Sequence, residues 1–595
     1  MNERLLSEVL RLRRRLDPVL LVGALLILLQ TVVRAVIVFP SYYWQDDFGH
    51  LEMGGRLGLS QEFLVRDYNG HLEVGQYLIY WLFAPHVNMS FVPAALSLLF
   101  LQVVASCILL SVLRVLFGRS PWILLPFAGY LFTPLGLPVA TWWAAGLQAM
   151  PLQIAMLVTL LGAVRVVRGN SWRWAALSIG GHAVGLFLWE KAALILPALL
   201  GVLVLVEWAR EPFGRRLRLL VQHWRFLVPH GMVLAAYVSF YLSEVHFADV
   251  LDREAPSVMS TSGETLFRML LPGLFGGPWT QSGAENTVFP YPANSLAAAF
   301  VVLFLGVVVS SVWLRGTRAF QGWLLVGGYV AADLVLLNRA ELIGLAVRDP
   351  RYITDSLPII SIGFCAAFWG PLVIRRTATP FSRTAGSMSP ALASTAFLIS
   401  SCLLTSFLVA DGLQHRDSRN YVYGVVQAMD DRPDVSVING PLPTGLNALT
   451  DLAGMLRAVG QERHFDEPGT DVRMFDGLAN LRPITVIEPR LEKSGPDVDC
   501  GWTVEAAWKR LGNLPDAQVG RQVIRLGYMT GQEATLHLAV GNDEQTLALP
   551  PGLGHATFVV TGQDGPVAVR VTNVASGGLC VIDVVAGTPW PAGEA

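Results

Sequence analysis

Charged residues are scarce in this chain of 595 residues: they make up 15% of it, whereas hydrophobic residues make up 53%. The mean hydropathy of +0.48 is too high for a soluble chain of this length. Lysine is almost absent, because Lys191, Lys493 and Lys509 are the three lysines and the remaining basic residues are arginines. The composition therefore favours an integral membrane protein.

Familiar catalytic and metal-binding motifs are also missing. The chain has no GxxxxGK[ST] phosphate-binding loop and no GxSxG motif of a serine nucleophile. It also has no CxxC or His/Cys spacing typical of metal sites, and its polar C-terminal part has no cluster of basic residues of the kind that binds nucleic acid. Cys500 and Cys580 flank that part of the chain. They form one disulfide if it lies outside the cytoplasm, or else remain two unpaired core thiols.

Long apolar stretches occur before residue 411 and not after it, which divides the chain into a membrane domain, 1–410, and a soluble domain, 411–595. A helix that crosses a bilayer needs roughly 20 mostly apolar residues. On this basis we predict eleven spans, at 19–39, 92–117, 121–138, 146–167, 172–189, 191–207, 226–244, 294–314, 320–337, 353–374 and 389–410.

The arginine clusters between these spans give the predicted orientation. The clusters at the N-terminus and in alternate turns all fall on one side, which the positive-inside rule identifies as the cytoplasm. The N-terminus is then cytoplasmic, and the soluble domain lies outside together with the large first loop, 40–91. Within that loop, residues 72–90 are apolar and aromatic but interrupted by charge and proline, which predicts an interfacial segment.

The soluble domain has two parts with different sequence patterns. Residues 420–490 are typical of an α/β fold, and residues 515–590 alternate apolar and polar residues between turns, which predicts a small β-sandwich. The predicted fold class is thus a polytopic α-helical membrane protein with an extracytoplasmic α/β plus β-sandwich-like domain.

The first candidate site is the acidic pair Asp46–Asp47, within WQDDFGH, at the outer end of the first predicted span. A second polar cluster, RDYNGH, ends at His71 in the same loop. Adjacent side chains diverge in an extended segment, so we expect one carboxylate to face a site while the other caps a helix or orients the backbone. The sequence leaves open which one does which, and loop solvation of both is the simpler alternative.

Over roughly residues 1–410 the order of elements resembles the GT-C glycosyltransferases, which include protein O-mannosyltransferases, lipid A aminoarabinose transferases and actinobacterial arabinosyltransferases. In that class an acidic residue just after the first helix is the catalytic base, and Asp46 or Asp47 matches its position. The segment from His71 through Tyr80 is similar to the interfacial helix that follows in those enzymes.

Glu190–Lys191, within FLWEKAALILP, is the second candidate, at an outer turn between predicted spans. Each charge costs about 2.5–3.5 kcal/mol at a bilayer centre, so the pair is interfacial or lines a polar cavity. We expect Lys191 to bind a donor phosphate and Glu190 to orient it or contact substrate, with a snorkelling ion pair as the alternative.

A third candidate is the segment from Arg348 to Tyr352, which resembles the Arg-Tyr-x-x-x-x-Pro signature in the last outer loop of several GT-C families, with a different spacing. The positive-inside rule disfavours arginines in a short outer loop. We therefore expect Arg348 and Arg351 to bind a lipid phosphate, with Tyr352 at the substrate; pairing with nearby carboxylates is the alternative.

Weaker signals complete the candidate site. Trp142 and Trp143 are expected either to stack on a sugar or to belong to an aromatic belt at the membrane interface. His50 and His71 are candidate substrate contacts. They also suit a divalent cation together with Asp47, although no family spacing supports a metal, and the sequence establishes no cofactor.

The sequence thus predicts an inverting glycosyltransferase of the cell membrane. Its donor would be a polyprenyl-phosphate monosaccharide and its acceptor a cell-envelope glycan, lipid or protein, with no nucleic-acid partner. Two alternatives remain: a flippase or transporter of lipid-linked sugars, and a cell-wall polymer ligase or polymerase. A transporter would place ionisable groups near the bilayer midplane and show a two-half repeat, which the sequence lacks.

Overall fold

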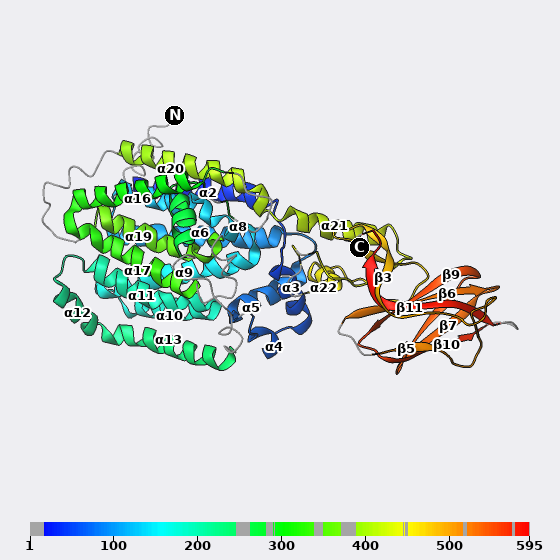
Figure 1. Cartoon of the computed structure of the whole chain (residues 1–595). Coiled ribbons are helices and arrows are strands. Elements are labelled where there is room, and N and C mark those ends of the chain that lie inside the picture. Colours follow the sequence, from blue (N-terminus) through cyan, green and yellow to red (C-terminus); the bar gives the residue numbers. More distant parts are fainter. Residues whose placement is uncertain are drawn as a thin grey trace, which may run out of the picture. The chain divides into compact units, whose positions relative to one another are not determined.

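The computed structural model divides into two compact units, residues 1–416 and 417–595, each of which is described here by itself (Figure 1). The described residues are 17–68, 70–245, 262–280, 289–290, 292–337, 349–370, 388–443, 445–446, 450–515, 520–573 and 578–593.

Long apolar helices build the first unit, which has the architecture of a polytopic membrane protein. They are α2 (Pro18–Val38), α6 (Val92–Phe117), α9 (Trp143–Val167), α13 (Trp224–Glu244), α16 (Asn294–Arg315), α17 (Ala319–Leu337) and α20 (Met388–Val409). Among the described residues, six segments are long and apolar enough to cross a membrane, or seven if one bent pair counts as a span. In this count α16 and α17 form one segment.

All eleven predicted spans fall largely on helix, but several of these helices are short or broken. The bent pair, Pro121–Phe132 and Pro134–Thr141, turns by 41° at a proline that lacks the N–H needed to continue the helix. The shorter elements are η2 (Pro121–Ile123), α7 (Leu124–Phe132), η3 (Pro134–Gly136), α8 (Pro138–Thr141), α10 (Trp172–Leu188), η4 (Glu190–Leu194), α11 (Ile195–Gly201), η5 (Val202–Glu207), α12 (Phe213–Gln222), η7 (Thr265–Leu270), α15 (Leu271–Leu274), η8 (Gly316–Arg318), η9 (Pro350–Tyr352), η10 (Thr354–Ser356), α19 (Leu357–Phe368) and η12 (Asp411–Leu413).

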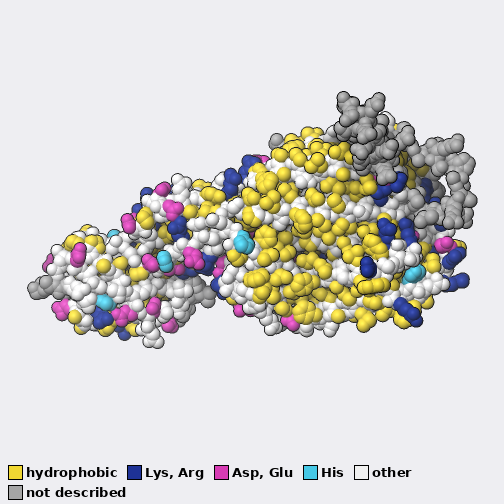
Figure 2. All heavy atoms as spheres, turned by 180° about the vertical axis from the view of Figure 1, so that it is seen from behind, with side chains coloured by type: hydrophobic (Ala, Val, Ile, Leu, Met, Phe, Trp, Pro, Cys, Tyr) yellow, Lys and Arg dark blue, Asp and Glu magenta, His cyan; other side chains and the backbone are white. Residues whose placement is uncertain are grey.

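The outside of this unit is strongly apolar. Figure 2 shows hydrophobic side chains spread over the face of the helical unit. Phe100 of α6, Val302 and Trp313 of α16 and Phe397 of α20 are each exposed by two thirds or more. Large apolar surfaces of this kind are unfavourable in water and suit contact with lipid.

The first loop folds into short helices instead of crossing. It contains α3 (Asp46–Leu57), α4 (Gln61–Leu64), α5 (Val74–Phe83) and η1 (Ala84–His86). At ten residues α5 is too short to span a bilayer, which agrees with the predicted interfacial character of residues 72–90.

The second unit begins with a small α/β part and continues as a β-sandwich. Its elements are α21 (Arg416–Asp430), β1 (Ser436–Val437), α22 (Leu452–Ala458), β2 (Val472–Phe475), β3 (Leu481–Ser494), β4 (Trp502–Val504), β5 (Lys509–Leu514), β6 (Arg521–Thr530), β7 (Ala534–Val540), β8 (Asp543–Leu549), β9 (Gly552–Thr561), β10 (Gly565–Thr572) and β11 (Leu579–Pro591). One sheet has the order β1-β2-β3-β11-β6-β9, with β4 also on β11, and the other has the order β5-β10-β7-β8.

Alternating burial explains the sandwich. In β7, every second residue from Ala534 to Val540 is buried, and these side chains join a core supplied by both sheets, including Phe558. A disulfide joins Cys500 to Cys580 at the start of β11. The disulfide alternative of the sequence analysis is therefore the one present.

Candidate active site

The acidic pair of the first loop lies at the N-terminus of α3. Asp46 and Asp47 are its first two residues, where the positive end of the helix dipole favours carboxylates. Gln45, just before them, has a φ of 42°, an uncommon conformation for a residue with a side chain, and it turns the chain sharply into the helix. Because the two side chains start one residue apart on a helix, they point in different directions and acquire different surroundings.

Asp47 is completely buried and holds three parts of the first unit together. Its Oδ1 accepts hydrogen bonds from the Tyr80 hydroxyl (2.7 Å) and the Ala144 N–H (2.9 Å), and its Oδ2 accepts one from the Trp44 N–H (3.0 Å). Ala144 lies in the first turn of α9, so Asp47 satisfies an N–H that the helix itself cannot. Burial raises the pKa of Asp47 to about 7.

Asp46, in contrast, is partly exposed. The Tyr68 hydroxyl donates a 2.8 Å hydrogen bond to its Oδ1. Burial raises the pKa of Asp46, while the charges of Arg351 and His71 and the bond from Tyr68 oppose that rise. Asp46 is thus a partly exposed residue whose carboxylate lies close enough to two cations to interact with them.

His71 comes from the turn after α4 and pairs with the second candidate segment. Its Nδ1 lies 2.6 Å from Oε1 of Glu190. Burial alone would lower the pKa of His71, but the Glu190 carboxylate outweighs it and raises that pKa to about 9. His71 is therefore a cation at neutral pH, and the Glu190 of the sequence prediction orients His71, not Lys191.

Glu73 is a member of this cluster that the sequence analysis did not select. It is buried just before α5, and its Oε1 accepts a hydrogen bond from the Gln148 side chain, whereas its Oε2 has no partner. Burial raises the pKa of Glu73 to about 8, an effect that His71 opposes and Glu190 increases. Glu73 therefore keeps its proton to a higher pH than a solvent-exposed glutamate does.

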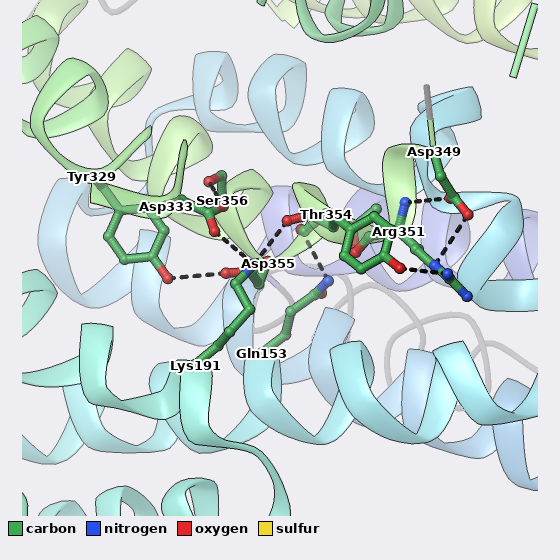
Figure 3. A network of polar contacts seen from close by, with 10 residues as sticks. Gln153, Lys191, Tyr329, Asp333, Asp349, Arg351, Thr354, Asp355 and Ser356 are labelled. Carbon is green, nitrogen blue, oxygen red and sulfur yellow. Dashed lines mark hydrogen bonds and ion pairs between the residues drawn. The ribbon is translucent and has the colours of Figure 1, made fainter. Parts of the chain in front are cut away.

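Arg351, in η9, is held with its guanidinium over an aromatic ring. It lies 4.1 Å from the ring centre of Trp142 and 4.5 Å from that of Tyr352, and its Nε is 3.1 Å from Oδ2 of Asp349. These contacts fix the plane of the guanidinium, and Figure 3 shows its attachment to Asp349 and Tyr352. Arg348, predicted to act beside it, lies outside the described residues.

Lys191 takes a different position from the one expected. Its Nζ is 2.6 Å from Asp333 Oδ1, 2.8 Å from Asp355 Oδ1 and 2.8 Å from the carbonyl oxygen of Tyr352. Figure 3 shows the side chain pointing into this cluster. Because three oxygens surround the ammonium, it anchors the segment that carries Arg351.

Several aromatic candidates are buried. Trp143 is 0% exposed and packs on Tyr43 and Tyr80, and Trp142 is 3% exposed beneath Arg351, so neither offers an open face to a sugar. His50 lies among tyrosine rings, and burial lowers its pKa to about 3. Among the described residues no group of three or more His, Cys, Asp or Glu side chains is placed to hold a metal ion.

His415, in contrast, was missed because it follows the last span with no motif around it. Its ring stacks on Trp44 at 4.4 Å with an interplanar angle of 5°, and it interacts with the charge of Arg351. A residue from the far end of the first unit's sequence thus lies against Trp44, two residues before Asp46.

The structure therefore brings together Asp46, His71, Glu190 and Arg351, which four separate segments supply. The partly exposed carboxylate of Asp46 interacts with the two cations, Glu190 pairs with His71, and the buried Glu73 interacts with His71 and Glu190. Such an arrangement can take a proton from a hydroxyl and bind an anionic group next to it.

Comparisons with known proteins give structural neighbours. No family model and no curated protein matches the chain. ArnT from Cupriavidus metallidurans bound to undecaprenyl phosphate is 14% identical with a TM-score of 0.39, and the match covers 76% of this chain and 85% of ArnT. Its apo state is 13% identical with a TM-score of 0.42 and the same coverage. The arabinofuranosyltransferase AftD from mycobacteria is 11% identical with a TM-score of 0.35, and the match covers 95% of this chain and 61% of AftD.

Proposed function

We propose that this protein is a membrane glycosyltransferase that moves a sugar from a polyprenyl-phosphate donor to an acceptor hydroxyl outside the cytoplasm. The observation that supports the proposal best is the partly exposed Asp46, whose carboxylate interacts with the charges of Arg351 and His71 in an apolar helical unit. This is what transfer from a lipid-linked phosphate requires: a base for the acceptor and cations for the leaving group.

The reaction is a single displacement. The acceptor oxygen forms a bond to the anomeric carbon, the bond between that carbon and the donor phosphate oxygen breaks, and the electron pair leaves with the phosphate. Asp46 takes the hydroxyl proton. One base on the face opposite the leaving group implies inversion, since retention usually requires a second carboxylate as nucleophile.

Arg351 is the proposed phosphate ligand, because a guanidinium binds two phosphate oxygens at once and Trp142 holds its plane in place. His71, made cationic by Glu190, adds a second positive charge to the same site. Lys191 acts indirectly in this proposal, by fixing the backbone of Tyr352 next to Arg351.

We assign the site to the extracytoplasmic side. The arginine distribution of the sequence supports this orientation. The disulfide between Cys500 and Cys580 supports it independently, because disulfides persist in oxidising compartments.

The test is transfer of radiolabelled sugar by the purified protein from synthetic polyprenyl-phosphate monosaccharides to cell-envelope acceptors. A labelled acceptor product supports the proposal. Turnover confined to polyprenyl-diphosphate oligosaccharides would favour the polymer ligase, and lipid translocation in proteoliposomes without any transfer would favour the flippase.

A further inference from the structure

The short helix α12, with the sequence FGRRLRLLVQ, carries an exposed apolar face. Figure 1 shows it at the edge of the helical unit, next to the start of α13. Phe213, Leu217 and Val221 are four residues apart, so they share one face of the helix, and they are 65%, 45% and 70% exposed. Exposed large apolar side chains gathered on one face are unfavourable in water, so this face requires an apolar partner.

Arg216 fixes which face of α12 is exposed. This arginine is buried, and its guanidinium donates hydrogen bonds to the carbonyl oxygens of Glu211 (2.7 Å), Val204 (3.1 Å) and Ala209 (2.7 Å), in η5 and in the turn that follows it. Leu219, three residues further along the same face, packs against the apolar core of the first unit. The helix is therefore held at one rotation, with its apolar face turned outward.

Exposed cations accompany the apolar face. Arg215 and Arg218 are exposed on α12, and Arg225 is exposed at the start of α13. Arg215 lies 3.2 Å from a carboxylate oxygen of Glu211. Arg218 and Arg225, in contrast, pair with no carboxylate in the part of the chain that the structure describes. Two guanidinium groups are thus free to bind an anion from outside the protein.

The surroundings of α12 indicate that its partner is a lipid. Trp224, Val228 and Met232 of α13 are again four residues apart and are 54%, 45% and 65% exposed. Helix α13 is long and apolar enough to cross a membrane. The Arg225 guanidinium lies 5.6 Å from the ring centre of Trp224, and tryptophan beside a basic residue is typical of a membrane interface. An apolar face that adjoins a membrane-spanning helix suits acyl chains.

The charge then selects among lipids. A guanidinium binds two phosphate oxygens at once, and basic amphipathic helices bind anionic membrane surfaces. The choline group of a zwitterionic lipid cancels the charge of its phosphate, so two unpaired arginines favour a lipid with a net negative charge.

We propose that α12 and the start of α13 bind the headgroup of an anionic phospholipid. Arg218 and Arg225 contact its phosphate, while Phe213, Leu217 and Val221 lie against its acyl chains. In the predicted orientation this lipid belongs to the cytoplasmic leaflet. The inference depends neither on the Asp46 site nor on the reaction proposed for it.

The test is native mass spectrometry of the full chain in detergent, in which the fraction of protein with bound lipid gives an apparent Kd. The probes are phosphatidylglycerol and phosphatidylcholine with identical acyl chains, and glycerol 3-phosphate as a soluble headgroup. The variants are Arg218→Gln and Arg225→Gln, singly and together, and the double lysine variant, which keeps both charges. Arg318→Gln is the matched control, because Arg318 is an exposed arginine of η8 outside α12.

We expect wild type to bind phosphatidylglycerol at least about tenfold more tightly than phosphatidylcholine. Each arginine near an anionic headgroup contributes about fivefold, so each glutamine variant should weaken phosphatidylglycerol binding about fivefold and the double variant about 25-fold. The double lysine variant should bind more tightly than the double glutamine variant, because it keeps the charge. Arg318→Gln should change binding by less than about twofold.

Equal affinity for the two lipids would overturn the proposal, as would unchanged binding in the double glutamine variant. An equal loss in Arg318→Gln would place the effect in the general positive charge of the protein instead of α12, and equally tight binding of glycerol 3-phosphate would exclude a lipid site; either result contradicts the proposal. The Tm of each variant checks its folding, and the single variants decide the question if the double variant does not fold.

Discussion

Exchanging the two adjacent aspartates for asparagine separates a base from a structural carboxylate. Asp46→Asn keeps the shape of the side chain and its hydrogen bond from Tyr68, but it removes the proton acceptor. Loss of a general base lowers turnover by about 10²- to 10⁴-fold. Asp47→Asn changes a buried side chain whose oxygens already accept hydrogen bonds from Tyr80, Trp44 and Ala144.

We therefore expect kcat to fall at least about 100-fold in Asp46→Asn and to stay within about tenfold of wild type in Asp47→Asn, because Asp47 contacts protein groups alone. The assay is initial-rate transfer from the best polyprenyl-phosphate donor, with Tm measured for each variant as a folding control. Equal activity of wild type and Asp46→Asn would refute the reasoning. So would an Asp47→Asn protein that keeps its Tm but loses 100-fold in kcat.

The remaining predictions concern charge, packing and the disulfide. Transfer should fall as the pH rises through about 9, where His71 loses its proton, and His71→Gln should lower the rate and abolish this alkaline limb of the pH profile. Arg351→Lys should raise KM for the donor even though it keeps the positive charge, because an ammonium lacks the planar fork that stacks on an indole. Titrations of the donor measure this. Lys191→Met should lower the free energy of unfolding by about 3–5 kcal/mol, since it leaves two buried carboxylates without their cation; thermal unfolding with Lys191→Arg as the comparison measures this. Replacing Cys500 and Cys580 by serine should destabilise the second unit by roughly 2–5 kcal/mol, as expected for the loss of a disulfide that closes a loop of this length, 80 residues; an unchanged unfolding midpoint of the oxidised and reduced protein would contradict it.

Hydropathy patterns predicted the helical architecture well, because membrane insertion depends on local composition. Apolar stretches coincide with helices, and alternating residues such as those of β7 coincide with sandwich strands. The number of uninterrupted long helices was harder to predict, since prolines such as Pro134 break a helix without making its sequence less apolar.

The site was predictable in part. Asp46, His71, Glu190 and Arg351 were selected from motifs, and the structure places them together. The different roles of Asp46 and Asp47 depend on the contacts of Asp47 with α5 and α9. These contacts join residues far apart in the sequence, so they cannot be predicted from the spacing of residues.

The partner of Lys191 could not be predicted for the same reason, because Asp333 lies 142 positions further along the chain. Glu73 and His415 were missed because neither belongs to a recognisable motif. Their burial and their neighbours, Gln148 and Trp44, give them their place in the site.

The most direct test of the central claim is the configuration of the new glycosidic bond, read by NMR from the product that purified wild-type protein makes from a polyprenyl-phosphate donor of known anomeric configuration. The site described here, in which Asp46 is a partly exposed carboxylate that interacts with both Arg351 and His71, predicts inversion, and no product from Asp46→Asn. Retention of configuration, or undiminished product from Asp46→Asn, would contradict it.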